Sequence, residues 1–277
     1  MFDGFEVLRS PDQLRSLARR WHAEGQKVAI IPVIGPVHDG HIALVREARS
    51  LGHRVAACLV DLDGGGLPRD IDTDAEELEH ARADAVIAPL IEKYCPDGFR
   101  TRLRVGGLTD VLCGKVEQGC FDHAVLITLR LINQSRADLV LISELQWQFA
   151  IILGQITGDL DIDTEIRIRP ALRAADGTPC SAEASALPYP ERRLAASFAR
   201  TLADAAQAIR SGCDPRSVCS NVGAALVDAG FETVDYLELR HAGTLMRVQD
   251  PATSGPARLF ASARLRGMRL LDNMAVA

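Results

Sequence analysis

The sequence predicts an α/β protein: a parallel sheet covered by helices on both faces, followed by a smaller C-terminal α+β domain. Over the first half of the chain, short apolar runs alternate with amphipathic segments, which is the pattern of consecutive β-α-β units. A stretch rich in small residues and proline, 173–190, then changes the composition. The residues after it predict two helices before several strands. We therefore expect domains at 1–172 and 173–277.

The elements of the first domain follow from periodicity and from turn residues. Ser10 and Pro11 precede apolar residues at helical spacing, so a capped helix is expected to run to Gly25. Residues 61–74 and 94–107 show neither the helical nor the strand spacing of apolar residues, so we expect loops there. We expect strands at 28–33, 54–60, 84–88, 138–142 and 164–168, and helices at 38–52, 75–83, 121–133 and 146–160.

The second domain is predicted from the same signals. Two amphipathic segments are long enough for helices, and the segments after them have the apolar spacing of strands. We expect helices at 191–209 and 215–229, and strands at 231–240, 244–248 and 257–263.

Composition and charge exclude several classes of protein. A net charge of -6 disfavours a general nucleic-acid binder, which needs a basic face. No apolar run is long enough to span a membrane, and the first residues lack the basic and apolar regions of a signal peptide. The seven cysteines form no C-x-x-C pair, which is typical of free thiols in a reducing compartment. We therefore expect a cytoplasmic protein without membrane or nucleic-acid partners.

The chemistry is expected to centre on Lys27–Ala48. An apolar run ends there in a turn with Gly35 and Pro36, and H-D-G-H follows at the start of a helix. A helix N-terminus suits a phosphate because free N–H groups and the positive end of the dipole lie there. His38 and His41, three residues apart, face the same side and can donate hydrogen bonds to charge that grows during a reaction. The alternative is that His38 only caps the helix and His41 packs beneath it.

H-D-G-H matches the H-x-G-H signature of nucleotidyltransferase ATP sites. The longer stretch I-I-P-V-I-G-P-V-H-D-G-H resembles P-T-M-G-x-L-H-x-G-H of the pantothenate synthetase (pantoate–β-alanine ligase) family. Further segments resemble that family's motifs in the same order along nearly the whole chain. They are 68–89, Y-C-P-D-G at 94–98 (similar to M-Y-P-x-G), A-D-G at 175–177 and R-L-L-D-N at 269–273.

The resemblance implies a Rossmann-like, nucleotidyltransferase-type domain, a small C-terminal domain that covers the site, and a homodimer. It implies that ATP with Mg2+ adenylates a small carboxylic acid, after which an amine attacks the acyl-adenylate. Position by position, it implies catalytic roles for His41, the proton donor, and for His38. It implies nucleotide binding by Ile34, Gly35, Gly40, Arg173 and Ser181, and substrate binding by Gln148, Trp147, Phe149 and Asp61.

Several motif residues of the family are replaced in this chain. This chain has Leu145 in place of the family's phosphate-binding lysine and Phe149 in place of its second substrate-binding glutamine. Glu183 stands in place of the arginine of L-S-S-R-N. The glutamine of F-V-N-P-x-Q-F has no counterpart at 59–65. Charge-assisted hydrogen bonds contribute roughly 1.5–3 kcal/mol each, so these changes remove contacts to anionic substrates. The pocket for the carboxylic acid is therefore predicted to be more apolar than the one for pantoate, because it would contain Leu145, Phe149 and Trp147.

Three functions remain open. The first is a pantothenate synthetase-like enzyme that condenses a small carboxylic acid other than pantoate with an amine, with altered or lost use of ATP. The second is a catalytically inactive binding or regulatory homologue, and the third is a pantothenate synthetase with compensating changes. We favour the first because H-D-G-H is intact.

The acidic loop offers a weaker alternative site. Asp61, Asp63, Asp70 and Asp72 carry the oxygen ligands that hard cations prefer. Acidic loop residues are more often simply solvated, so no metal site is predicted there.

Overall fold

The computed structural model describes residues 5–60, 69–88 and 95–276. Its chain divides into two compact units. Unit 1 comprises Met1–Thr109 and Glu117–Pro170, and unit 2 comprises Asp110–Val116 and Ala171–Ala277. Independently folding domains with a boundary after residue 172 stay a prediction.

Unit 1 contains a six-stranded parallel sheet in the order β1-β4-β3-β2-β5-β6. This confirms the parallel α/β sheet predicted from the alternation of strands and helices. Its elements are β1 (Glu6–Leu8), α1 (Pro11–Ala23), β2 (Lys27–Ile34), α2 (Asp39–Ser50), β3 (His53–Val60), α3 (Ile71–His80), β4 (Ala85–Ile87), α6 (Cys120–Ser135), β5 (Leu139–Ser143), the 3-10 helix η1 (Glu144–Gln146), α7 (Trp147–Asp159) and β6 (Glu165–Arg169).

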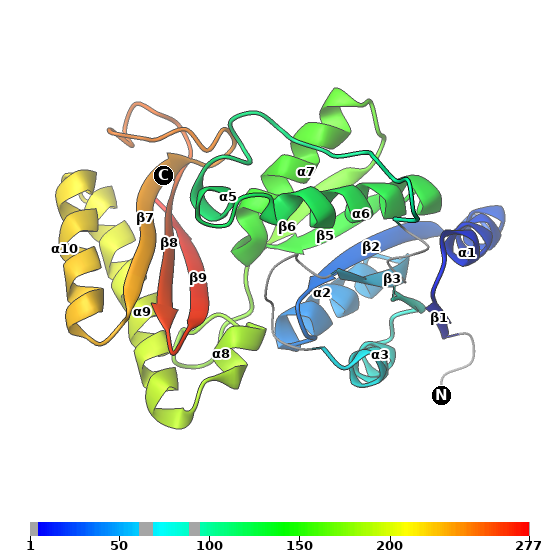
Figure 1. The fold of residues 1–277 in the computed structure, drawn as a ribbon, viewed down its shortest axis with the longest axis horizontal. Coiled ribbons are helices and arrows are strands. Elements are labelled where there is room, and N and C mark those ends of the chain that lie inside the picture. Colours follow the sequence, from blue (N-terminus) through cyan, green and yellow to red (C-terminus); the bar gives the residue numbers. More distant parts are fainter. Residues whose placement is uncertain (1–4, 61–68, 89–94, 277) are drawn as a thin grey trace. The chain divides into compact units, whose positions relative to one another are not determined.

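Helices cover both faces of this sheet: α2 and α3 lie on one face, and α1, α6 and α7 lie on the other (Figure 1). Strand β2 shows why the sequence requires this arrangement. Every residue of β2 from Val28 to Val33 is buried, so both faces of the strand need an apolar layer. Ala29, Ile31 and Val33 share one core with side chains of α2 and α3.

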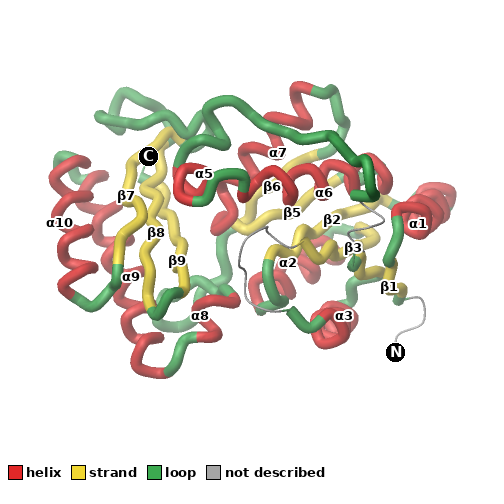
Figure 2. Tube along the Cα trace, in the orientation of Figure 1, coloured by secondary structure: helices red, strands yellow, loops and turns green. Residues whose placement is uncertain are grey.

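Unit 2 contains a three-stranded antiparallel sheet in the order β7-β8-β9. Figure 2 shows these strands in yellow with the helices α9 and α10 beside them in red. Phe198 and Leu202 of α9 and Leu226 of α10 share a core with Leu259 of the sheet. The elements are α5 (Leu112–Val116), α8 (Ala182–Ala186), α9 (Tyr189–Arg210), α10 (Pro215–Asp228), β7 (Thr233–His241), β8 (Ala257–Leu265) and β9 (Met268–Ala275). Among the helices that the structure describes in both units, none combines the length and the apolar character needed to cross a membrane.

Helix α3 begins four residues before the predicted start at 75, so the predicted loop end is wrong. Asp70 is the N-cap, and its carboxylate accepts hydrogen bonds from the backbone N–H groups of Asp72 (3.1 Å) and Thr73 (3.4 Å). An aspartate cap and further acids in the first turn stabilise a helix start. The acidic run therefore opens a helix here.

Other differences concern short or irregular elements. The strand predicted at 244–248 is wrong: an isolated bridge joins Arg240 and Arg247, and Leu245 has a left-handed φ of 55°. Strand β9 was not predicted, although it pairs along β8 from Met268 to Ala275. The short elements β1, α5 and α8 were not predicted, because three to five residues without a clear apolar run give no periodic signal.

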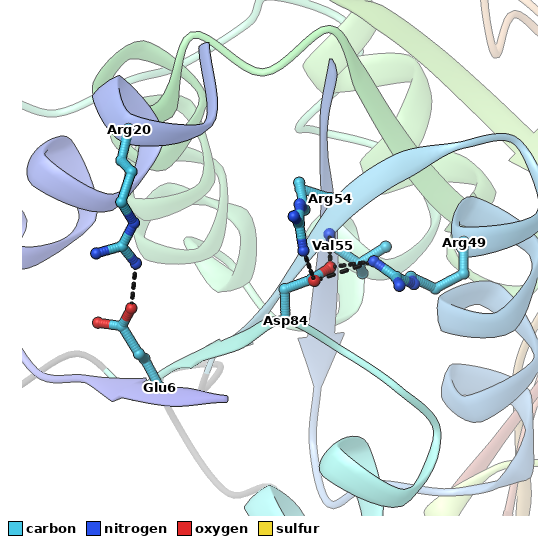
Figure 3. A network of polar contacts seen from close by, with 6 residues as sticks. All are labelled: Glu6, Arg20, Arg49, Arg54, Val55 and Asp84. Carbon is cyan, nitrogen blue, oxygen red and sulfur yellow. Dashed lines mark hydrogen bonds and ion pairs between the residues drawn. The ribbon is translucent and has the colours of Figure 1, made fainter. Parts of the chain in front are cut away.

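Asp84 connects three elements at the amino edge of the parallel sheet (Figure 3). Its carboxylate accepts hydrogen bonds from the guanidinium groups of Arg49 in α2 (2.7 and 3.0 Å) and Arg54 in β3 (2.8 Å). It also accepts one from the backbone N–H of Val55 at 2.8 Å. The Asp84 side chain is 12% exposed, so solvent replaces these contacts poorly.

We expect Asp84→Ala to lower the free energy of unfolding by about 2 kcal/mol. The substitution leaves the Val55 N–H without its acceptor, and an unsatisfied buried donor costs about 1–3 kcal/mol. Urea unfolding of both proteins measures the difference. Glu6→Gln is the matched control, because the ion pair between Glu6 and Arg20 (Figure 3) is largely exposed and such pairs contribute roughly 0–1 kcal/mol. Equal losses in the two variants would contradict the role given to Asp84.

Candidate functional site

The order of the parallel strands marks one place in unit 1 for a ligand. From β2 the chain passes to β3 on one side, and it later returns to β5 on the other side of β2. Ligands in open parallel sheets bind beyond the carboxyl ends of the strands where the order reverses in this way. The two strands end at Ile34 and Ser143. H-D-G-H follows the first of these ends.

The turn after β2 is held by a buried ion pair. Gly35 has a φ of +73°, a left-handed conformation that glycine adopts without strain. The Arg69 guanidinium donates hydrogen bonds to the carbonyl oxygens of Val33 (3.0 Å) and Gly35. Arg69 also pairs with Asp74 at 3.3 Å, and both side chains are 7% exposed. The Asp74 carboxylate also accepts a hydrogen bond from the backbone N–H of Val37 at 2.9 Å. The ion pair of Arg69 and Asp74 therefore holds the turn on both sides.

His38 is the N-cap of α2. Its Nδ1 accepts a hydrogen bond from the backbone N–H of Gly40 at 3.1 Å. A nitrogen that accepts from an amide carries no proton, so the neutral ring bears its proton on Nε2. Burial lowers the pKa of His38 to about 4, against a smaller opposing effect of Asp39. His38 is therefore neutral at physiological pH and offers Nε2–H as a donor.

His41 lies in the first turn of α2 and is 4% exposed. Its ring centroid is 3.9 Å from that of His38, with 37° between the ring planes. Burial, then His38 and the Arg69 guanidinium, hold the pKa of His41 well below its usual 6.5. Within the described part of the chain, the Nδ1 atom of His41 is buried and has no hydrogen-bond partner. The site thus contains two neutral imidazoles in contact, with their planes tilted against each other.

The amide groups of this helix start are partly occupied. The carbonyl oxygen of His38 accepts the N–H groups of His41 (2.8 Å) and Ile42 (3.2 Å), and its ring accepts that of Gly40. A phosphate at this end would therefore be bound mainly by the imidazole N–H groups and by the helix dipole.

The two depressed histidine pKa values predict acid sensitivity. Between about pH 6.5 and pH 4 the unfolded chain binds protons at positions 38 and 41 that the folded chain excludes. Stability is therefore complete above pH 6.5 and falls as the pH drops, by up to about 1.4 kcal/mol per pH unit and histidine. Urea unfolding at pH 7 and pH 5 should show a smaller loss in a His38→Asn/His41→Gln variant than in the unmodified chain. An equal loss would show that these rings are protonated in the fold.

The predicted substrate residues lie at the start of α7, after β5. Gln148 is 5% exposed, and its Nε2 donates to the carbonyl oxygen of Leu108 at 2.8 Å. Phe149 is 2% exposed and belongs to the core. Trp147 is half-buried as the first residue of the helix. Substrate binding by these residues stays a prediction, and Asp61 lies outside the described residues.

Arg173 and Ser181 belong to unit 2 and have local partners there. The Arg173 guanidinium forms two 2.8 Å hydrogen bonds with the carboxylate of Asp272, whose side chain is fully buried. Ser181 caps the short helix α8, and its Oγ accepts the N–H of Ala184 at 3.1 Å. Nucleotide binding by either residue stays a prediction.

Arg69 and Asp74 were not predicted to be part of the site. Arg69 lies in the segment 68–89 that resembles a family motif, and Asp74 is the last residue of the predicted loop 61–74. The available signal was the spacing: Asp70 as a helix cap places Asp74 one turn into α3, on its buried side. A buried acid needs a partner, and Arg69 is the arginine nearest to it along the chain.

Comparisons with known proteins agree along the whole chain. A family model described as pantoate-beta-alanine ligase matches residues 6–275. A pantothenate synthetase from Dinoroseobacter shibae is 36% identical, with 98% of this chain and 99% of that protein covered. One from Roseobacter denitrificans is 35% identical, with coverages of 98% and 97%.

Solved structures give the same result. The pantothenate synthetase from Thermus thermophilus has a TM-score of 0.86 at 27% identity, with 98% of this chain and 99% of that chain covered. A pantoate-beta-alanine ligase from Francisella tularensis, complexed with beta-gamma ATP and beta-alanine, has a TM-score of 0.80 at 20% identity, with 98% of both chains covered. This second likeness concerns the fold alone.

Proposed function

This chain belongs to the pantoate–β-alanine ligase family, and from that premise we propose that it forms an amide bond between a small carboxylic acid and an amine. We propose further that the acid is not pantoate and that the use of ATP is altered or lost. The observation that carries the proposal is the close, neutral pair of His38 and His41 at the strand-order reversal. A helix start that needed only a cap would not require the second, buried imidazole.

The two imidazoles are suited to stabilising negative charge. A neutral ring donates one hydrogen bond without bringing a positive charge into a buried site. Such donors act strongly where water is excluded, because the local dielectric is low. We assign this role to Nε2–H of His38 and to the N–H of His41. Where ATP is used, the charge to be stabilised is that on its phosphate oxygens as the carboxylate displaces pyrophosphate.

The change of substrate is supported by the residues at the start of α7. Phe149, at the position of a substrate glutamine in the resembled motif, is a core residue, and the Gln148 amide is bonded to a backbone carbonyl. The start of α7 therefore does not offer a substrate the two glutamine amides that the resembled motif supplies. Leu145, at the lysine position, adds no charge. We infer an acid with fewer hydroxyl groups than pantoate.

Mg2+ has no step in this proposal. Among the residues that the structure describes, no group of three or more His, Cys, Asp and Glu side chains is arranged to hold a metal ion. The Arg69 guanidinium near His41 also disfavours a cation there, because like charges repel.

The second candidate function is a catalytically inactive binding or regulatory homologue. It is favoured by the occupied amide groups at the start of α2, which His38 already caps. A pantothenate synthetase with compensating changes is the third, and the names of the relatives favour it.

Calorimetric titration with ATP and Mg2+ separates these functions when it is combined with a pyrophosphate-release assay. The assay would contain β-alanine and a panel of small carboxylic acids that includes pantoate. Release with another acid supports the proposal, and release with pantoate alone supports the third function. Binding without release supports the inactive homologue. Absence of binding at millimolar ATP would rule out the ATP-dependent reaction.

A cytoplasmic homodimer is part of the same proposal. It rests on family membership, since dimerisation was expected from the resemblance. Light scattering of the purified protein measures the mass, and a value near that of one 30.0 kDa chain would rule out the dimer.

A further inference from the structure

Cys95 and His123 are in contact within unit 1. The Sγ atom of Cys95 lies 3.5 Å from Nε2 of His123, and both side chains are half-buried. His123 lies in the first turn of α6, and this helix ends just before β5 begins. Helix α6 therefore runs opposite to the strands, and its first turn lies at their carboxyl edge. The pair is thus at the edge of the sheet where this type of fold binds ligands.

The surroundings of Cys95 differ from those of purely structural cysteines. Cys58 is fully buried in β3, and burial raises its pKa far above the usual value. Burial, then Glu238 and Asp214, raise the pKa of Cys219 to about 11. Cys95 is only half-buried, and an imidazole nitrogen lies 3.5 Å from its sulfur, which is the arrangement of a nucleophile beside a base. It also stands at the tyrosine position of the segment similar to M-Y-P-x-G, so the thiol is a departure from that motif.

We propose that Cys95 and His123 form a nucleophile–base pair that accepts acyl groups from activated esters. The sulfur attacks the carbonyl carbon, and a C–S bond forms while the bond from carbon to the leaving oxygen breaks. The thiol proton passes to Nε2 of His123 and then to the leaving oxygen. The product is a thioester on Cys95, with the alcohol or phenol released. This reaction is independent of the proposed ligase activity.

The test is acetylation of the purified full-length protein by p-nitrophenyl acetate. Release of p-nitrophenol gives the rate, and mass spectrometry of tryptic peptides gives the site. Cys95 lies in the peptide 94–100, and Cys213 lies in 211–216, after cleavage at Lys93 and Arg210. Cys213 is an exposed cysteine and serves as the internal control. We expect Cys95 to be acetylated at least tenfold faster than Cys213.

Two variants assign the roles. Cys95→Ser is expected to abolish labelling of peptide 94–100 as a thioester, and His123→Asn to slow it by about tenfold or more, since a general base contributes at least that much. Labelling of Cys213 should stay unchanged in both. The proposal is overturned if Cys95 and Cys213 react at equal rates in the unmodified protein, a comparison that needs no variant to fold. It is also overturned if His123→Asn, with an unchanged melting temperature, reacts as fast as the unmodified chain.

Discussion

Replacing His41 by alanine is expected to lower ATP-dependent pyrophosphate release by about 100-fold or more. The ring is neutral and buried, and it lies in contact with the ring of His38. Removing one donor that stabilises developing charge in a buried site costs about 10²–10³ in turnover. The assay is pyrophosphate release with the best acid of the panel, measured at saturating ATP. The loss should fall on kcat more than on KM, because the donor acts chiefly on charge that appears during the reaction.

His80→Ala is the matched control for this result. His80 is an exposed residue in the last turn of α3, and its ring contacts only the backbone of Glu76 among the hydrogen bonds described for it. The control should retain full activity. If His41→Ala retains activity as well, with an intact fold by circular dichroism, the ring is a packing residue and the mechanism proposed for the site is wrong.

Replacing Asp74 by alanine is expected to lower the free energy of unfolding by about 3–5 kcal/mol. The change leaves the Arg69 guanidinium buried without its carboxylate and leaves the Val37 N–H without its acceptor. Removing one partner of a buried ion pair has this magnitude because the other charge stays desolvated. Urea unfolding and thermal melting measure the effect, which corresponds to roughly 10 °C in melting temperature.

Asp72→Ala is the control for Asp74, since Asp72 is exposed in the same helical turn. We expect a change below about 1 kcal/mol, the scale of a helix-dipole interaction. A double variant, Arg69→Met/Asp74→Leu, should recover part of the loss because it removes both charges. Equal destabilisation by Asp72→Ala and Asp74→Ala would show that the acids act only through the helix start.

The sequence predicted the parallel sheet because its strands are long apolar runs with clear turns between them. Lys27–Ile34 and its following helix were found for this reason, and His38 and His41 with them. The ion pair of Arg69 and Asp74 was missed because it joins two segments through a buried contact that no local pattern encodes. Strand β9 was missed because apolar and polar residues do not alternate regularly along it. Asp272 and Asn273 are polar but buried, since hydrogen-bond partners in the fold satisfy their side chains.

The substrate residues show a second limit. Replacement of polar motif residues by Leu145 and Phe149 predicted an apolar pocket, but a side chain such as Phe149 can as easily enter the core. The sequence cannot tell these outcomes apart, since both need only an apolar residue. The buried position of Phe149 is a property of the packing around α7.

The cap made by His38 bears on how such chains diverge. A chain released from selection for catalysis would still be selected to fold, and folding needs an acceptor at position 38 for the Gly40 N–H. Asparagine, aspartate or serine would satisfy that need as well as histidine does. Under drift, we therefore expect position 38 to vary among asparagine, aspartate, serine and histidine. The buried imidazole at position 41 would instead be replaced by any apolar side chain of similar size. In a lineage of related sequences, the fate of His41 is thus the more informative record of retained chemistry.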